Sequence, residues 1–282
     1  MIARKKEGEK TMKKIITLIL TVILSLGCVA GLTACNKNDN FVANAATDVE
    51  GEVYGFIISK NASKKTEILA AMNKVIAETD INKAIDYYTA VEKGQTPSVT
   101  LEFPNLSDNT AGQLNVYTES GFVPYEFVGD DNKVIGVDMY LMQLVCEELN
   151  MTLNITDMGF DGICGKVALE DNAVGAAGIT INDERKETLD FSNPYVSSVQ
   201  YIVSTKEQNF TKISDLAGKT IGVQKGTTGY FMVAKAIEEG ALKDTGATVI
   251  QYDSLPVAYT ALKANKVEIV VGDKLPILSL VD

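Results

Sequence analysis

The order of apolar and polar residues along the chain predicts strands that alternate with helices. Leu114–Tyr117 is a short β-rich run, and after a turn the apolar residues of 138–149 recur at helical spacing. The alternation continues through strands and helices at 173–181, 220–237 and 249–271. Because strands joined through helices usually lie parallel in a sheet that the helices cover, the pattern predicts an α/β protein.

Ahead of this region, the pattern predicts a separate strand with two helices. Residues 53–59 form a β-rich run, and apolar residues at helical spacing follow over 68–77 and 80–90. Residues 92–112 contain two prolines and several turn-forming residues but no stable period, which indicates a linker. With 282 residues and 46% hydrophobic content, two lobes of modest size are expected.

Residues 1–34 have the pattern of an export signal. Basic residues lead into an apolar run that starts at Ile15. The run is followed by LTAC, which ends at Cys35 and resembles the lipobox of bacterial lipoproteins, where the cysteine becomes the lipidated first residue. The alternative, a permanent membrane helix over 15–34, is disfavoured because the apolar core is short and interrupted by glycines. Residues 35–51 are rich in Asn, Asp and Ala, so a flexible tether without packing is expected there.

Composition disfavours several classes of chemistry. Without residues 1–34 the chain carries 20 basic and 35 acidic side chains, a net charge of −15, which disfavours nucleic acid as a partner. The chain has no histidine, so the commonest general base and a usual zinc and haem ligand are missing; neither a metal nor a cofactor is expected. Cys146 and Cys164 are expected to be buried free thiols, and a disulfide between them is the alternative for an exported protein.

Two segments are candidate anion sites. In AGITINDERKETLDFS at 177–192, Arg185 can offer a planar fork of donors to a carboxylate, while Gly178 and Thr180 add backbone and hydroxyl donors. A solvated turn is the alternative for this segment. In KGTTG at 225–229, between a predicted strand and helix, free backbone N–H groups favour an anion. The spacing is not that of a P-loop, so a carboxylate fits better than a triphosphate, and an ordinary turn with a threonine N-cap is the alternative.

Aromatic and acidic residues follow other predicted strands. Phe122 and Phe160 lie in loops, where they could sandwich the apolar part of a ligand or pack in the core. Asp273 and Glu119 hold positions from which a carboxylate can meet an ammonium, or else cap a helix. Together with the two anion sites, these residues describe a site for a zwitterion with a side chain, which is an amino acid.

Residues 114–276 resemble the polar amino acid solute-binding proteins of ABC importers, the bacterial extracellular solute-binding proteins of family 3. The resemblance rests on GFVPYEF, IGVDMYLMQLV, MGFDG, AGITINDERKETLDFSNPY, ISDLAGKTIGVQKGTTG and VVGDKLP, which occur in the family's order and at close to its spacings. It implies a two-lobed periplasmic-binding-protein-like fold of type II. Each lobe would be a mostly parallel sheet flanked by helices, with the ligand in the cleft between the lobes.

The family's ligand contacts carry over to matching residues of this chain. One lobe would supply Glu119, Phe122, Phe160, Gly178, Thr180 and Arg185, and the other would supply Thr227, Thr228 and Asp273. The resemblance implies that Arg185, Thr180 and Thr228 hold the ligand carboxylate. Asp273 and the carbonyl group of Gly178 would hold its ammonium. The two phenylalanines would form aromatic walls, and the glutamate would face the ligand side chain, which hints at a polar or cationic amino acid.

Residues 52–91 resemble the family's C-terminal strand and helices, although they stand at the front of this chain. We hypothesise a circular permutant in which the linker 92–112 joins the old end to the old beginning. Residues 52–91 would pack on a first lobe of 113–198, and 199–282 would be the second lobe. The new chain ends would lie at one of the family's two crossings between the lobes. Only the crossing near Tyr195 to Gln200 would then remain covalent. The alternative is a gene fragment whose front segment belongs to a preceding tandem copy or pairs with a neighbouring molecule.

The resemblance implies a protein on the extracellular face of the cell membrane, anchored by lipid at Cys35. As a monomer it would capture a free amino acid between its lobes and deliver it to the permease of an ABC importer, without covalent chemistry. One alternative is a lyase of the cyclohexadienyl dehydratase kind on the same fold, with Glu119 as its acid. The other is a sensor module that reports an amino acid to a signalling partner. A single acid does not distinguish glutamine from arginine or lysine as the ligand.

Overall fold

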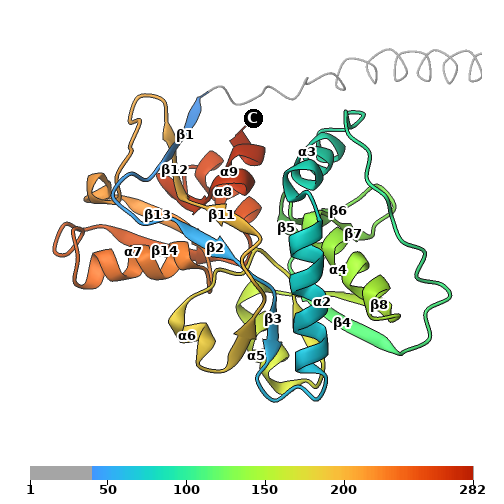
Figure 1. Cartoon of the computed structure of the whole chain (residues 1–282). Helices are drawn as coiled ribbons and strands as arrows, with labels where there is room; N and C mark the ends of the chain where they lie inside the picture. Colours follow the sequence, from blue (N-terminus) through green and yellow to red (C-terminus); the bar gives the residue numbers. More distant parts are fainter. Residues whose placement is uncertain (1–39, 282) are drawn as a thin grey trace, which may run out of the picture. The chain divides into compact units, whose positions relative to one another are not determined.

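Residues 40–281 are the part of the chain that the computed structural model describes, and Figure 1 draws them in colour. The predicted export signal and the lipidation site at Cys35 lie outside these residues. None of the described helices has the length and apolarity that crossing a membrane requires.

The first sheet has five strands in the order β10-β3-β9-β4-β8. These strands are β3 (Ile57–Ser59), β4 (Gln113–Thr118), β8 (Thr152–Asp157), β9 (Ala173–Gly175) and β10 (Leu189–Phe191). As the alternation of strands and helices predicts, β4 is parallel to both β8 and β9, whereas β3 runs antiparallel to β9 and β10. Helices α2 (Lys65–Glu78), α4 (Val137–Glu148) and α5 (Phe160–Leu169) contact strands of this sheet, and α3 (Ile81–Glu92) packs on α4.

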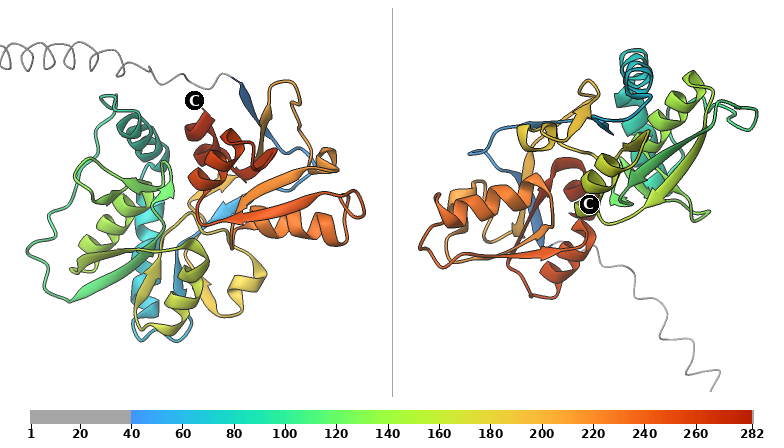
Figure 2. Two further views of the ribbon diagram at one scale, coloured as in Figure 1. Left: turned by 180° about the vertical axis from the view of Figure 1, so that it is seen from behind. Right: turned by 90° about the horizontal axis from the view of Figure 1, so that it is seen from below.

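Helices cover both faces of this sheet (Figures 1 and 2). The two isoleucines of β3 explain this arrangement, because neighbouring side chains on a strand point to opposite faces. Ile58 is fully buried in the cluster that contains Met72 of α2 and Leu141 of α4. Ile57 is fully buried in a second cluster, where it packs with Ile163 of α5. The helix predicted over 138–149 is confirmed as α4.

The second sheet has five strands in the order β1-β12-β15-β13-β14. They are β1 (Phe41–Ala45), β12 (Gln200–Thr205), β13 (Thr220–Gln224), β14 (Thr248–Tyr252) and β15 (Ile269–Asp273). Strands β14, β13 and β15 are parallel, and β12 is antiparallel to β15. The accompanying helices are η1 (Ile213–Leu216), α7 (Thr228–Glu238), α8 (Leu255–Lys263) and α9 (Lys274–Val281). We call residues 52–198, with the first sheet, lobe 1, and residues 40–51 with 199–281 lobe 2.

Strand β1 shows that the prediction of an unpacked tether over 35–51 is wrong from Phe41 onward. All five residues of β1 pair with β12 in antiparallel register. Beyond the strand, the Asp48 carboxylate accepts the backbone N–H groups of Ile213 at 2.8 Å and Ser214 at 3.1 Å. Asn and Asp are typical of unpacked chain, but here an aspartate satisfies the free N–H groups at the start of η1, which local composition does not reveal.

The chain crosses between the lobes at two places, which lie side by side. Strand β2 (Glu52–Tyr54) leads from β1 of lobe 2 to β3 of lobe 1, and β11 (Val196–Ser198) leads back toward β12. The two strands pair in antiparallel register. The prediction of a single covalent crossing near Tyr195 to Gln200 is therefore wrong, because the described residues include both strands of the connection.

A small three-stranded sheet in lobe 1 contains β5 (Gly121–Phe122), β6 (Glu126–Val128) and β7 (Val134–Ile135).

Candidate functional site

Arg185 is positioned by the local sequence around it. Asn182 caps the short helix α6 (Asp183–Lys186), and its side-chain oxygen accepts the backbone N–H of Arg185 at 2.9 Å. The guanidinium donates from Nη1 to the carbonyl oxygen of Thr180 at 2.8 Å and from Nη2 to that of Gly226 at 3.2 Å. Thr180 belongs to lobe 1, and Gly226 follows β13 of lobe 2, so the guanidinium bridges the two lobes.

A cavity of about 10 Å³ lies where the two lobes meet. It is lined by Phe122, Phe160, Gly178, Thr180, Arg185, Gln224, Thr227, Thr228 and Asp273. The structure thus brings together eight of the nine residues predicted to contact the ligand, from separate elements of both lobes. The ninth, Glu119, is their neighbour, because its Oε2 accepts a hydrogen bond from Nε2 of Gln224 at 3.1 Å. A space of this size holds about one water molecule.

Gln224 was not among the predicted residues, although its position carries a signal. It is the last residue of β13 and is only 3% exposed. A polar side chain at the carboxyl end of a buried parallel strand is well placed for ligand contact in α/β folds. The segment KGTTG follows it directly, so the two features together could have identified it.

Glu52 is another residue of this site that the sequence patterns do not single out. Its Oε2 accepts the hydroxyl groups of Thr180 at 2.5 Å and Thr228 at 2.7 Å, and its Oε1 accepts Nε2 of Gln200 at 2.6 Å. Glu52 begins β2, far from these partners in sequence. Only the pairing of β2 with β11 brings its carboxylate into the site.

Asp273 is a second acidic group in the site, at the end of β15. It is 6% exposed, and its Oδ1 accepts the hydroxyl groups of Tyr54 at 2.5 Å and Ser198 at 3.4 Å. Burial, followed by the negative charge of Glu52, raises the pKa of Asp273 well above its usual range. A cation placed beside Asp273 would favour the ionised carboxylate and so lower this raised pKa.

The segment KGTTG combines a helix cap at Thr227 with a hydroxyl donor at Thr228, which is directed into the site. Thr227 caps α7, since its Oγ1 accepts the backbone N–H of Tyr230 at 3.2 Å, and its hydroxyl donates to the carbonyl oxygen of Gln224 at 2.7 Å. The N-cap that the sequence left as the alternative is therefore present at Thr227. Thr228, the first residue of the helix, directs its hydroxyl into the site instead. The start of α7 also favours an anion through the helix dipole.

Comparison with known proteins identifies the family. The model of the bacterial extracellular solute-binding proteins, family 3, matches residues 114–240. An ancestral arginine-binding protein bound to arginine is 34% identical, with a TM-score of 0.54 over 60% of this chain and 74% of that one. The holo arginine-binding protein of T. maritima is also 34% identical, with a TM-score of 0.55 over 60% of this chain and 73% of the other. This chain belongs to the family 3 solute-binding proteins.

The predicted two-lobed fold of type II is thereby confirmed for this family 3 protein. The L-cystine-binding protein TcyJ of Escherichia coli (strain K12) is a further relative, 30% identical over 172 residues, which are 60% of this chain and 62% of that protein. The chain spans 62% to 66% of the length of the first curated relatives that it matches.

Glu119 makes the stability of this family 3 protein depend on pH. Burial raises the pKa of Glu119 from 4.5 to about 7, and the charge of nearby Asp157 adds to that rise. Between these two values the folded protein keeps a proton that the unfolded chain releases. The free energy of unfolding therefore falls as the pH rises through this window, by up to about 1.4 kcal/mol per pH unit. We expect Glu119→Gln to remove this part of the slope in urea unfolding followed from about pH 5 to about pH 8.

A matched control for this experiment is Glu207→Gln, which neutralises an exposed glutamate of lobe 2. It should follow the parent protein at every pH. If Glu119→Gln kept the slope of the parent, Glu119 would not hold a proton in the folded state.

Gly178 allows the close packing of the site through its backbone. Its φ of +54° lies in the left-handed region, and a Cβ atom there would come within 2.4 Å of Cε1 of Phe122. We expect Gly178→Ala to lower the free energy of unfolding by about 1–3 kcal/mol, because the backbone is strained and the Phe122 ring must move. Ligand affinity should also fall, because the Phe122 ring is predicted to form one aromatic wall of the ligand site. Urea unfolding and calorimetric titration measure the two effects.

Gly165→Ala is the comparison for this substitution. Gly165 lies inside α5, and a Cβ atom added there would have no atom within 4 Å apart from its chain neighbours and the backbone of its own helix. Alanine at this position should therefore stabilise the protein by about 0.5–1 kcal/mol. If the two alanine variants unfolded at the same urea concentration, the strain assigned to Gly178 would be refuted.

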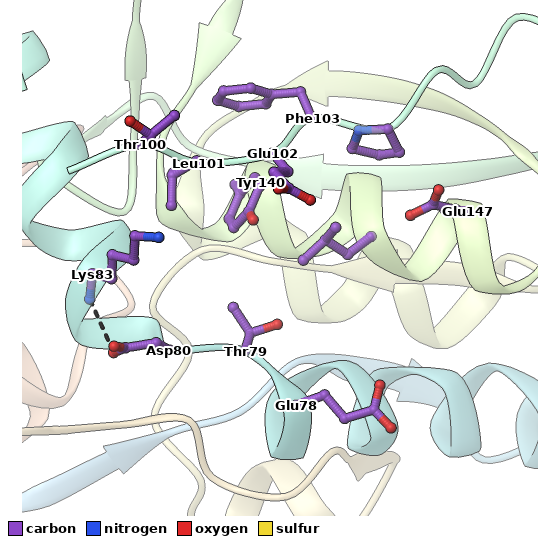
Figure 3. Close-up of a pocket in the computed structure, with 12 residues that line it drawn as sticks. Glu78, Thr79, Asp80, Lys83, Thr100, Leu101, Glu102, Phe103, Tyr140 and Glu147 are labelled. Atoms are coloured by element: carbon purple, nitrogen blue, oxygen red, sulfur yellow. Dashed lines mark hydrogen bonds between the residues drawn. The ribbon is translucent and has the colours of Figure 1, made fainter.

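A larger cavity of about 580 Å³ lies where the linker passes the junction of α2 and α3 (Figure 3). Its lining includes Asp80, Lys83, Phe103 and Tyr140. The backbone N–H of Lys83 donates to Asp80, which is the N-cap of α3, and the rings of Phe103 and Tyr140 meet edge to face. None of the residues predicted to bind the ligand lines this cavity, so we place the candidate site at the smaller one.

The described residues bear on the predictions for metal ligands and for the two cysteines. Within residues 40–281, no group of three or more His, Cys, Asp or Glu side chains is arranged to hold a metal ion. Cys146 and Cys164 are both free thiols, as predicted, but only Cys146 is buried, whereas Cys164 is partly buried. Burial raises the pKa of both thiols, so neither is activated as a nucleophile.

Proposed function

We propose that this chain is the ligand-capturing component of an ABC importer for a free amino acid. The observation that carries the proposal is the cavity between the lobes, which gathers eight of the nine residues predicted to bind such a ligand. Relatives named for arginine, cystine and histidine binding support it. The protein would present the closed, loaded form to a permease and perform no covalent chemistry.

An amino acid has two charged ends, and the site offers a partner to each. The carboxylate would bind the guanidinium of Arg185 and the hydroxyl groups of Thr180 and Thr228, at the start of α7. The ammonium would bind Asp273, whose buried carboxyl group gains most from a positive partner. The ligand side chain would pass between the two phenylalanines toward Glu119. A polar or cationic side chain fits that end best, because a buried carboxyl group needs a hydrogen-bonding or charged partner.

Entry of the ligand requires the lobes to separate. A cavity of about 10 Å³ is far smaller than an amino acid, and the guanidinium of Arg185 closes it by bonding to carbonyl groups of both lobes. The paired strands β2 and β11 are the connection at which such a motion would occur. Capture would therefore couple binding to closure, with the ligand stabilising the closed form.

A melting screen of the purified full chain against the twenty amino acids tests this proposal. A ligand present at about a hundredfold excess over its Kd adds about 2.7 kcal/mol to the free energy of unfolding, which shifts the melting temperature clearly. Calorimetry should then give one site per chain, and mass spectrometry should recover the ligand unchanged, which separates capture from a lyase reaction. A screen without any stabilising amino acid would contradict the proposal.

We also propose that lipid attached to Cys35 holds the protein, as a monomer, on the extracellular face of the cell membrane. The support is the signal-like sequence of residues 1–34 and the LTAC motif. Cys35→Ser should release the protein from the membrane fraction, whereas Cys164→Ser should leave it there. Equal membrane retention of both variants would refute the anchor.

The circular permutation is a further proposal, and three contacts support it. Strand β3 lies between β9 and β10 in the sheet of lobe 1, α2 packs on α4, and α9 contacts β1 in lobe 2. The model of the family begins to match only at residue 114, after the linker. A rearranged chain in which 113–282 is followed by 40–92 should therefore fold and bind the same amino acid with a similar Kd. Failure of that chain to fold in isolation would favour the rival explanation, pairing with a neighbouring molecule.

A further inference from the structure

The Glu52 carboxylate stands at the anion-binding end of the proposed site. Both threonine hydroxyls assigned to the ligand carboxylate, those of Thr180 and Thr228, donate to its Oε2, at 2.5 and 2.7 Å. The side-chain amide of Gln200 donates to its Oε1 at 2.6 Å. Thr228 is the first residue of α7, so the carboxylate also lies where the helix dipole favours a negative charge. A carboxylate of the protein itself thus has the hydrogen-bond donors expected for that of the ligand, and it also lies beside Asp273, whose pKa its charge raises.

Glu52 and a ligand carboxylate cannot both use this environment. A threonine hydroxyl has a single proton to donate, so Thr180 and Thr228 cannot serve two carboxylates at once. The cavity beside them, about 10 Å³, has no room for a second carboxylate group. Two like charges held at hydrogen-bonding distance from the same donors would also repel each other strongly.

The contacts of Glu52 join both lobes. Thr180 belongs to lobe 1, while Thr228 and Gln200 belong to lobe 2. Glu52 itself lies on β2, opposite Ser198 of β11, in the connection between the lobes. It is only partly buried, so its side chain can turn away without unfolding of the core. Its three hydrogen bonds therefore hold the two lobes against each other.

We propose that Glu52 is an internal competitor of the ligand carboxylate, which holds the lobes together until an amino acid displaces it from Thr180 and Thr228. The role assigned to the ligand rests on the proposed function, whereas the contact between the lobes does not. An amino acid can bind only to molecules in which Glu52 has left Thr180 and Thr228. The apparent Kd is therefore the intrinsic Kd divided by the fraction of molecules in that state, so the apparent affinity is lower. Glu52 therefore sets the affinity, and it discriminates against ligands with a weakly binding carboxylate.

Hydrogen exchange of the full chain without ligand tests the contact between the lobes. Glu52→Ala removes the carboxylate, Glu52→Gln keeps its shape without its charge, and Glu50→Ala removes an exposed glutamate two residues away. Exchange in peptides covering 224–230 should be at least about threefold faster in Glu52→Ala, because the lobes open more often. Glu52→Gln should lie between the parent and the alanine variant, and Glu50→Ala should match the parent. Unchanged exchange in Glu52→Ala would overturn the proposal.

Titration with L-arginine and agmatine tests the competition itself. Agmatine is arginine without its carboxylate, so it has no group with which Glu52 would compete. Glu52→Ala should bind L-arginine about tenfold more tightly than the parent and should bind agmatine no more tightly. Weaker binding of L-arginine by Glu52→Ala would overturn the proposal and make Glu52 a partner of the ligand ammonium. If no variant bound L-arginine, arginine would be excluded as the ligand, while the exchange result would still decide whether Glu52 holds the lobes together.

Discussion

Replacing Arg185 with alanine is expected to weaken amino acid binding by at least about a hundredfold. Among the residues that line the cavity, Arg185 alone is positively charged. Its loss would leave the ligand carboxylate without a charged partner in a cleft that excludes water, a change that costs about 2–5 kcal/mol in comparable buried pairs. Calorimetric titration with the amino acid found in the melting screen measures the change in Kd.

Two further variants make this result specific. Arg185→Lys should bind with intermediate affinity, because an ammonium cannot donate two parallel hydrogen bonds. Lys186→Ala removes the next basic residue of α6, an exposed side chain, and should leave Kd unchanged. Urea unfolding of each variant separates a binding defect from a folding defect. Binding by Arg185→Ala within about threefold of the parent would refute the assignment of Arg185 to the ligand carboxylate.

Replacing Asp273 with asparagine is expected to weaken binding and to stabilise the ligand-free protein. The amide cannot pair with the ligand ammonium as a carboxylate does, so Kd should rise by about tenfold or more. In the ligand-free protein, burial and the charge of Glu52 raise the pKa of Asp273 well above its usual range. The folded state therefore holds a proton that the unfolded chain releases above the ordinary pKa of 3.8, and stability is lost as the pH rises.

Asparagine does not titrate, so Asp273→Asn does not lose stability in this way as the pH rises. The free energy of unfolding of the variant relative to the parent should therefore be unchanged near pH 4 and should increase above it by up to about 1.4 kcal/mol per pH unit. Tyr54 can still donate to the amide oxygen, so packing at the site is kept. Asp215→Asn, at an exposed position in η1, should change neither binding nor the pH dependence. A variant Asp273→Asn with the parent's Kd would remove Asp273 from the ligand site, and a parent-like pH slope would show that its carboxyl group is ionised.

Local sequence accounts for the parts of the site that depend on short-range chemistry. Asn182 starts the helix that carries Arg185 by accepting its backbone N–H, and Thr227 starts α7 in the same way. Gly178 can adopt its left-handed φ because it has no Cβ. These residues could be recognised from sequence because capping and turn formation involve neighbours a few positions apart.

Residues that reach the site through long-range pairing were missed. Glu52 meets Gln200 and Thr228 only because β2 pairs with β11. Strand β1 was missed for the same reason, since its partner β12 lies far along the chain and its own five residues have no distinctive period. A short strand is stabilised by its partner, and the identity of that partner is not encoded in the strand alone.

The sequence by itself determined the α/β alternation, offered the threonine cap of α7 and, through the family resemblance, named eight of the nine residues that line the cavity, all but Gln224. Each of these depends on spacing or on side-chain chemistry within short segments that can be recognised one at a time along the chain. Tertiary structure alone decided that the lobes are joined by two paired strands and that Glu52 bonds to the threonines of the anion site. The physical reason is that both facts are contacts between distant segments, whose register is set by the packing of the whole fold.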